Sequence, residues 1–223
     1  MTSLLQTAQS RHLWRLRAEF GAFFILTPAV IALALPPERM FSALFASMVL
    51  GLFLLHITAD FRWQGLVTGF GRVNWRFVGL FTLLTIVTAT TVVLTLEPDA
   101  FLILARTQPA LLLMIMLLYP IFSALPQELV FRPLFFRRYQ SILPEGLWPK
   151  ILLNAALFSW AHLMYWHWVV LAMTFFGGLA FAYSYEARRN FPETVVLHAI
   201  SGNIVFALGL GLYFYSGNVA RPF

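Results

Sequence analysis

The sequence predicts an all-α fold, a polytopic membrane bundle of seven transmembrane helices, or eight if the fourth divides. Hydrophobic residues make up 60% of the 223 residues and charged residues only 11%, against about half and about a quarter in soluble domains. The hydrophobic residues also fall into blocks of roughly 17–25, the length of a helix that crosses a bilayer. We therefore expect an integral, multi-pass membrane protein whose first partner is the lipid bilayer.

Seven blocks are apolar enough to be membrane spans: residues 19–35, 41–58, 77–96, 108–136, 150–166, 168–184 and 194–215. The first is long and other spans follow it, so we expect an uncleaved helix rather than a signal peptide. The fourth is too long for one plain span and contains Pro120, Pro126 and Pro133, which predict a break or a tilt. Residues 1–18 would form a cytoplasmic arm, and residues 19–223 a single transmembrane domain.

The basic residues predict the orientation. With the N-terminus in the cytoplasm, eleven of the fifteen arginines and lysines lie on the inner side, three on the outer side, and Arg132 lies within a span. Because inner loops carry an excess of these residues, we expect a cytoplasmic N-terminus, in the inner membrane if the source is bacterial. The same rule accounts for the net charge of +6 without a nucleic-acid partner. The absence of cysteine excludes disulfides and thiolate chemistry.

One acid and one base stand inside the fourth span, in "PQELVFRPLFFRRY". An ionisable group in the hydrocarbon region costs at least about 2.5–3.5 kcal/mol and commonly marks a functional site. Glu128 and Arg132 are four residues apart, so they share one helix face. The alternative is an ion pair that only locks the bundle, although desolvation often cancels the gain from such pairs. The flanking prolines favour a hydrated pocket beside Glu128.

Two histidines lie deep in later spans. Asn154, Phe158 and His162 follow one another at intervals of four in "LNAALFSWAHL", and His198 precedes Ser201 and Asn203 in "VVLHAISGN". A single helical histidine is more often structural, but the asparagine and the buried acid favour a site. Two chemistries fit these residues. Glu128 could activate water as a general base with help from a histidine, or Glu128, His162 and His198 could bind zinc.

The stretches "QELVFR", "FSWAH" and "HAISGN" resemble, in order, the three motifs of the CAAX protease and bacteriocin-processing enzyme family, also called Abi. Its members are intramembrane proteases of glutamate type. Their motifs are two adjacent glutamates followed four positions later by arginine, phenylalanine with histidine four positions later, and histidine with asparagine four positions later. The resemblance covers about residues 110–215, the protease-like half of the chain.

The resemblance implies an intramembrane endopeptidase that cuts a membrane-associated protein or peptide without a cofactor. Glu128 would be the base, assisted by His162, and His198 would polarise the scissile carbonyl. The supporting residues would be Gln127, Arg132, Asn154, Phe158, Ser201 and Asn203. The sequence departs from the family at two positions: Gln127 stands where the family has its first glutamate, and Gly202 where it has its asparagine.

These departures leave alternatives open. Because glutamine cannot act as a base, either Glu128 takes that role or the chain is a catalytically inactive relative that acts as a membrane binding or immunity protein. A zinc-dependent version of the same peptidase would use Glu128, His162 and His198 as ligands, although the helical HExxH spacing is missing. A transporter or channel is disfavoured, because such folds pair broken spans in two related halves.

Overall fold

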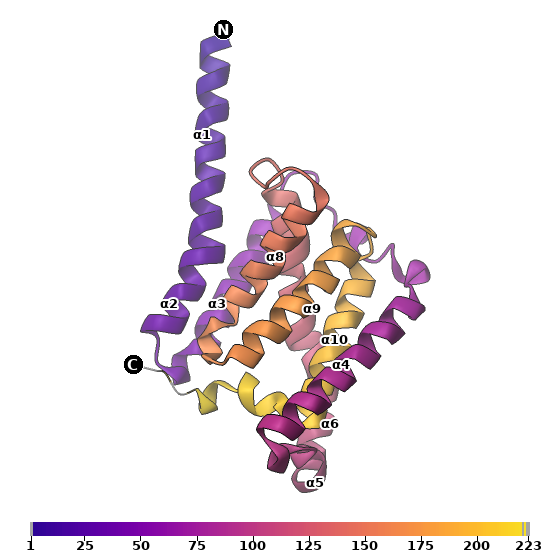
Figure 1. Cartoon of the computed structure of the whole chain (residues 1–223). Helices are drawn as coiled ribbons and strands as arrows, with labels where there is room; N and C mark the ends of the chain where they lie inside the picture. The colour runs from indigo at the N-terminus through magenta and orange to yellow at the C-terminus, as the bar shows by residue number, and fades with distance from the viewer. Residues whose placement is uncertain (1, 220, 222–223) are drawn as a thin grey trace.

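The computed structural model describes residues 2–219 and 221, with side chains for residues 9–215, 217–219 and 221. Within these residues the chain is almost entirely helical and contains no β-strand. Figure 1 shows the main helices packed side by side, with the N-terminal helix extending beyond the body of the bundle. The prediction of an all-α helical bundle is confirmed.

The N-terminal rod consists of three consecutive helical elements, α1 (Thr2–Phe20), the π-helical η1 (Gly21–Leu26) and α2 (Thr27–Ala34). Residues 9–34 of this rod are long and apolar enough to cross a membrane. The span is therefore longer than the predicted residues 19–35, because α1 runs into it without a break. The predicted arm, residues 1–18, is helical over its described part, and its cytoplasmic location stays a prediction.

The next two long helices are α3 (Pro37–His56) and α4 (Trp75–Leu96), close to the predicted spans. Two short 3₁₀ turns, η2 (Trp63–Leu66) and η3 (Phe70–Arg72), connect them. The Asn74 side chain begins α4 by accepting a hydrogen bond from the Phe77 backbone N–H, 3.1 Å away, which satisfies one donor of the first turn. After α4 the chain turns through η4 (Pro98–Ala100) and α5 (Ile103–Thr107).

The fourth predicted span does not break. It is one continuous helix of 30 residues, composed of α6 (Pro109–Tyr119), η5 (Pro120–Ala124), α7 (Leu125–Leu129) and η6 (Val130–Arg138). Two of its three prolines lie in the π-helical segments η5 and η6. A π-helical turn is wider than an α-helical one, so it accommodates a proline ring and the missing N–H that would otherwise kink the helix.

The C-terminal half contains α8 (Leu147–Ala161), η7 (Leu163–Tyr165), α9 (Trp168–Glu186) and α10 (Phe191–Leu208), followed by η8 (Leu210–Phe214) and η9 (Ser216–Asn218). The helix α10 ends at Gly209, whose φ of 109° is in the left-handed region that glycine adopts at helix ends. The last predicted span, 194–215, was therefore too long at its C-terminal end.

Six helices of the described chain are long and apolar enough to cross a membrane, against seven predicted. The difference is α8, which has only 15 residues because the chain leaves the helix at His162. This helix packs along α9. The count of seven or eight spans is thus not confirmed, and α8 is a shorter helix of the bundle.

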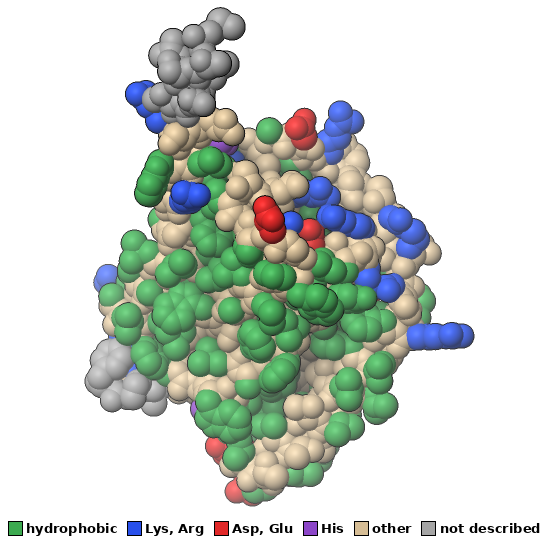
Figure 2. Space-filling model, turned by 45° about the horizontal axis from the view of Figure 1, so that its top comes forward, with side chains coloured by type: hydrophobic (Ala, Val, Ile, Leu, Met, Phe, Trp, Pro, Cys, Tyr) green, Lys and Arg blue, Asp and Glu red, His purple; other side chains and the backbone are tan. Residues whose placement is uncertain are grey.

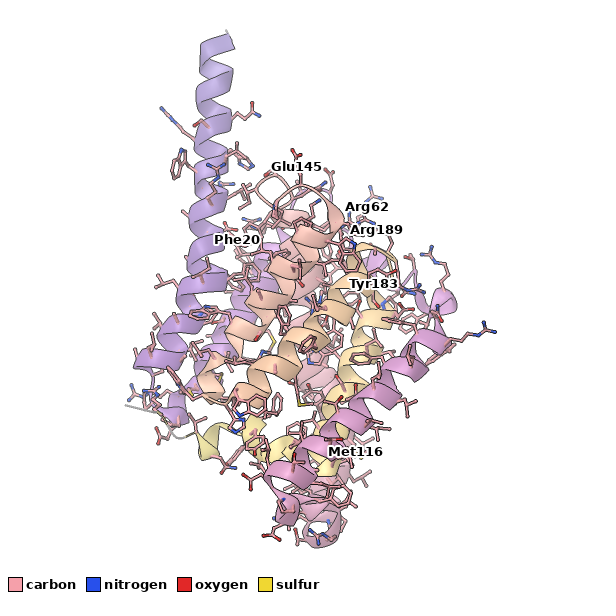
Figure 3. All side chains as sticks on the ribbon, viewed as in Figure 1. Phe20, Arg62, Met116, Glu145, Tyr183 and Arg189 are labelled. Atoms are coloured by element: carbon pink, nitrogen blue, oxygen red, sulfur yellow. The ribbon has the colours of Figure 1, made fainter. Side chains whose placement is uncertain are left out.

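The outer surface is that of a protein solvated by lipid. Large apolar side chains are exposed over the sides of the bundle, among them Phe41, Leu83 and Phe122. Figure 2 shows hydrophobic side chains covering much of one face, with lysine and arginine side chains gathered along one end. Figure 3 labels Arg62 and Arg189 at the end from which α1 extends, and Met116 at the opposite end. Exposed apolar area on this scale indicates a membrane environment.

Candidate active site

Glu128 and Arg132 form a fully buried ion pair on the fourth span. Arg132 Nε donates to Glu128 Oε2 over 2.7 Å, Arg132 Nη2 lies 3.4 Å from Glu128 Oε1, and both side chains are 0% exposed. The spacing of four puts them on one helix face, as the sequence predicts. A carboxylate and a guanidinium removed from water need further hydrogen bonds to be satisfied.

Asn154 of α8 supplies one of these further hydrogen bonds. Its side-chain oxygen accepts a hydrogen bond from Arg132 Nη1, and its Nδ2 donates to the Phe131 carbonyl over 2.7 Å. The guanidinium also lies over two aromatic rings, with its central carbon 5.1 Å from the Phe158 ring centre and 5.8 Å from that of Phe181. These contacts fix the arginine between three helices and keep its charge beside Glu128.

His198 of α10 completes the pairing of Glu128. Its Nδ1 lies 2.8 Å from Glu128 Oε1. Because Arg132 stands beside the same carboxylate, Glu128 is the acceptor in this contact and His198 Nδ1 carries the proton. The imidazole stacks on Phe181 with ring centres 4.9 Å apart and meets Phe158 edge to face at 5.5 Å. Its second nitrogen, Nε2, has no hydrogen-bond partner among the described residues.

His162 follows the last turn of α8 and has the same tautomer for a different reason. Its Nδ1 lies 2.7 Å from the Phe158 carbonyl oxygen, which can only accept, so Nδ1 carries the proton. The Phe158 ring separates the two histidines, 4.7 Å from His162 and 5.5 Å from His198 between ring centres. No hydrogen bond joins His162 to Glu128 in the described part of the chain.

A cavity of about 1220 Å³ opens beside these histidines. Its walls come from α3, α4, the fourth span (α6, η5 and α7), α8, α9 and α10, and they are mostly apolar. Polar side chains gather in one part of the wall, where Gln127, His162 and His198 line the cavity together with Ser123 and Ser201. The residues Glu128, Arg132 and Asn154 do not line it. The ion pair therefore lies behind His198, which separates Glu128 from the open space.

Of three other predicted site residues, two line this cavity and one packs between helices. Gln127 lines the cavity and donates from Nε2 to Ser123 Oγ over 2.9 Å. Ser201 also lines it, but its hydroxyl donates to the His198 backbone carbonyl over 3.0 Å. Asn203 points elsewhere: its Nδ2 donates to the Met116 carbonyl of α6 over 3.1 Å, and its side-chain oxygen is buried without a partner.

The predicted zinc ligands Glu128, His162 and His198 are not arranged as a metal site. Among the residues that the structure describes, no group of three histidine, cysteine, aspartate or glutamate side chains could hold a metal ion. Both oxygens of Glu128 are engaged by Arg132 and His198, and the histidine nitrogen nearest Glu128 carries a proton rather than a free lone pair. The donor chemistry therefore does not fit the predicted ligand set of Glu128, His162 and His198.

Two residues of the site were missed by the sequence analysis. Phe181 stacks on His198, and Tyr119 lines the cavity with its ring 6.0 Å from that of His198. Both are aromatic residues within apolar helices, where nothing in the local pattern separates a site residue from a packing residue. Only Gly202, standing where the family motif has asparagine, gives an indirect signal for Tyr119.

The comparison with known families agrees with the geometry. Residues 109–214 match a family described as type II CAAX prenyl endopeptidase Rce1-like. Residues 109–214 are therefore similar to this family, which is part of the CAAX protease and bacteriocin-processing enzymes. The match includes Tyr119, Glu128, Arg132, His162 and His198 and leaves α1–α5 outside it. No curated protein and no solved structure matches the chain. Six apolar helices in the described chain and the match to a membrane protease family indicate an integral, multi-pass membrane protein.

Proposed function

We propose that the protein is an intramembrane endopeptidase that hydrolyses a peptide bond of a membrane-associated substrate with a water molecule activated by His198 and Glu128. One observation carries the proposal. Glu128 Oε1 lies 2.8 Å from Nδ1 of His198, while Nε2 of the same ring has no hydrogen-bond partner among the residues that the structure describes and His198 lines the cavity. A buried carboxylate behind a histidine fixes the tautomer of the ring and stabilises the imidazolium that forms when the ring takes a proton.

The reaction begins when the oxygen of a water molecule attacks the scissile carbonyl carbon. His198 Nε2 accepts a proton from that water, and the carbonyl π bond becomes the negative oxygen of a tetrahedral intermediate. The carbonyl then re-forms, the C–N bond breaks, and the imidazolium returns the proton to the leaving amine. The products are an amine terminus and a carboxylic acid, which still carries the second proton of the water and releases it to the amine or to solvent to become a carboxylate; His198 is neutral again.

In this mechanism Glu128 acts through His198 instead of touching the water. The sequence analysis expected the carboxylate itself to be the base, but Glu128 is 0% exposed and does not line the cavity. His162 is a second acceptor for the water, since its Nδ1 proton is held by the Phe158 carbonyl and its Nε2 carries the lone pair. Gln127 lines the same wall with one amide N–H bonded to Ser123 and a second N–H available to the substrate.

The proposal includes no cofactor; among the described residues, Glu128, His162 and His198 do not form a metal-binding group. It also includes a cytoplasmic N-terminus, in the inner membrane if the source is bacterial, because eleven of fifteen basic residues then lie on the inner side. A substrate segment within the membrane must unwind locally, because a helical carbonyl is already hydrogen-bonded. A purified protein that loses peptidase activity on chelation and regains it with Zn²⁺ would contradict the cofactor-free part.

A second candidate function is favoured by the two departures from the family motifs. Gln127 and Gly202 replace two groups with which the family is expected to act, and a chain without them could bind membrane peptides or confer immunity without cutting. The two functions differ in one measurable way. A binding protein tolerates Glu128→Gln and His198→Ala as long as it folds, whereas the peptidase does not.

The test is a comparison of membrane protein termini in a strain that lacks the gene, complemented with wild type, Glu128→Gln or His198→Ala at matched expression. We expect new N- and C-termini with wild type only, and accumulation of the uncut proteins with both variants. Leu83→Ala on the lipid-facing side of α4 is the matched control and should process like wild type. Identical termini in the wild-type and His198→Ala strains would refute the peptidase function.

A further inference from the structure

This protein has no side chain at the position where the family motif has its asparagine. Gly202 stands four residues after His198 on α10, one helical turn along the same face. It is buried, although a glycine within a helix costs stability relative to alanine. The reason for the glycine is the space beside it, which another residue occupies.

That residue is Tyr119, at the end of α6. A Cβ atom added to Gly202 would overlap the edge of the Tyr119 ring and its hydroxyl oxygen. The phenol oxygen thus occupies the volume from which an asparagine side chain at position 202 would extend. The ring is held by edge-to-face contacts with His198 at 6.0 Å and Phe206 at 5.7 Å between ring centres.

Tyr119 belongs to the polar part of the cavity wall. Tyr119, Ser123 and Gln127 line the cavity along one helix face, at intervals of four residues. Gln127 donates to the Ser123 oxygen, so the Ser123 proton is free to be donated to the phenol oxygen. The phenol then keeps its own proton for a substrate oxygen, since a hydroxyl has one donor and two acceptor positions.

We infer that Tyr119 is the oxyanion donor of this site, its O–H taking the place of the amide that the family carries at the position of Gly202. The inference rests on the proposed peptidase function. Negative charge develops on the carbonyl oxygen when water attacks, and a fixed donor in a low-dielectric site stabilises that charge most in the transition state. Loss of one such donor lowers kcat about 10²–10³-fold.

The side chains at positions 202 and 119 therefore depend on each other. Tyr119 can take its position only if residue 202 has no Cβ, and an asparagine at 202 can reach the cavity only if the ring is absent. The pair therefore predicts a reciprocal substitution. Tyr119→Ala with Gly202→Asn would rebuild the arrangement of the family motif. Tyr119→Ala alone leaves the site without a donor. Gly202→Asn alone makes the new side chain overlap the Tyr119 ring.

The experiment uses purified full-length protein in liposomes containing membrane proteins extracted from the strain that lacks the gene, and measures the initial rate at which new C-termini form. Tyr119→Phe removes only the hydroxyl. We expect its rate to fall about 10²–10³-fold with thermal stability unchanged. Tyr119→Ala with Gly202→Asn should be at least about tenfold faster than Tyr119→Ala alone. A Tyr119→Phe protein that cuts at the wild-type rate, or a double variant no faster than Tyr119→Ala, overturns the inference.

A stability measurement separates this result from the fate of the proposed function. Gly202→Ala should lower the melting temperature in the wild-type background and have little effect in the Tyr119→Ala background, because the overlap with the ring is gone. Equal losses in both backgrounds would show that the two residues do not share this space and would overturn the inference without any activity assay. If wild type itself forms no new C-termini, the peptidase function fails; if wild type cuts and Tyr119→Phe cuts equally fast, only the role of Tyr119 fails.

Discussion

Replacing Glu128 with glutamine separates the two roles that the structure gives this carboxylate. Glu128 neutralises Arg132 and orients His198, and all three side chains are buried. The substitution keeps the shape of the residue and removes the charge. An amide at this position can donate to His198 Nδ1, which would favour the tautomer with the proton on Nε2, the wrong nitrogen for a base that faces the cavity.

The two effects have separate magnitudes. A buried arginine left without its partner costs about 3–5 kcal/mol in the free energy of unfolding. Removing the arginine as well, in Glu128→Gln with Arg132→Met, eliminates the unpaired charge and leaves about 1–3 kcal/mol for the side-chain oxygen of Asn154, which loses its donor. Catalysis is not recovered, because the ring still lacks its carboxylate. We expect both proteins to cut about 10²–10⁴-fold more slowly than wild type.

Steric trapping in bicelles measures the free energy of unfolding of each variant, and the liposome cleavage assay measures the rate. The double variant is the control for folding, since it should be more stable than Glu128→Gln and equally inactive. A double variant that cuts at the wild-type rate would show that Glu128 serves only to balance Arg132. The mechanism through His198 would then be refuted, even if the stability values agreed with the calculation.

Three further predictions concern the rest of the bundle. Gly51→Ala should cost about 1–3 kcal/mol by overpacking, because its Cβ would lie 2.8 Å and 2.9 Å from two neighbouring side chains, whereas Gly65→Ala, with nothing within 4 Å, should change the free energy of unfolding by less than about 0.5 kcal/mol. Glu193→Gln should cost about 1.5–3 kcal/mol, since this buried carboxylate accepts hydrogen bonds from three groups; Glu186→Gln, whose single partner Arg189 is 60% exposed, should cost less than about 1 kcal/mol. Burial lowers the pKa of His167 below its usual value near 6.5, so the unfolded chain binds the proton more readily. The stability that neutral His167 contributes is fully present at a pH above its usual pKa and is lost as the pH falls through the lowered pKa of the folded protein. Thermal unfolding at several pH values measures this loss. His167→Gln is the control and should make stability less dependent on pH.

The prolines of the fourth span explain why its break was predicted wrongly. Pro120, Pro126 and Pro133 indicate a kink when each is judged against an ideal α-helix. The helix instead widens into π-helical turns around Pro120 and Pro133 and continues. Sequence rules that consider only an α-helix or a helix break cannot predict these π-helical turns, because their stability depends on packing against α3 and α10.

The shorter α8 shows a different limit. Its apolar stretch runs on past Ala161, so composition predicts a full span over 150–166. The helix ends where the His162 ring contacts the Phe158 carbonyl. The end of α10 was also predicted wrongly, at residue 215, although a glycine with a left-handed φ, such as Gly209, is a common helix-ending signal.

The site itself was partly predictable. The buried acid and base, the asparagine and the two histidines stand out because polar residues are rare in these spans, and the structure brings Glu128, Arg132, Asn154 and His198 into one hydrogen-bonded network. Which of them meets water could not be predicted, since the order of Glu128 and His198 relative to the cavity depends on how α10 packs on α7. Tyr119 was invisible for the same reason: its role arises from contact with Gly202, 83 positions further along the chain.

The most direct test of the account is hydrolysis in isotopically labelled water. Purified wild-type protein and His198→Ala are placed in liposomes with membrane proteins of the strain that lacks the gene, in H₂¹⁸O, and the new C-termini are analysed by mass spectrometry. The account predicts new C-terminal carboxylates that carry one ¹⁸O atom with wild type, and none with His198→Ala. No labelled termini with wild type, or the same labelled termini with His198→Ala, would contradict it.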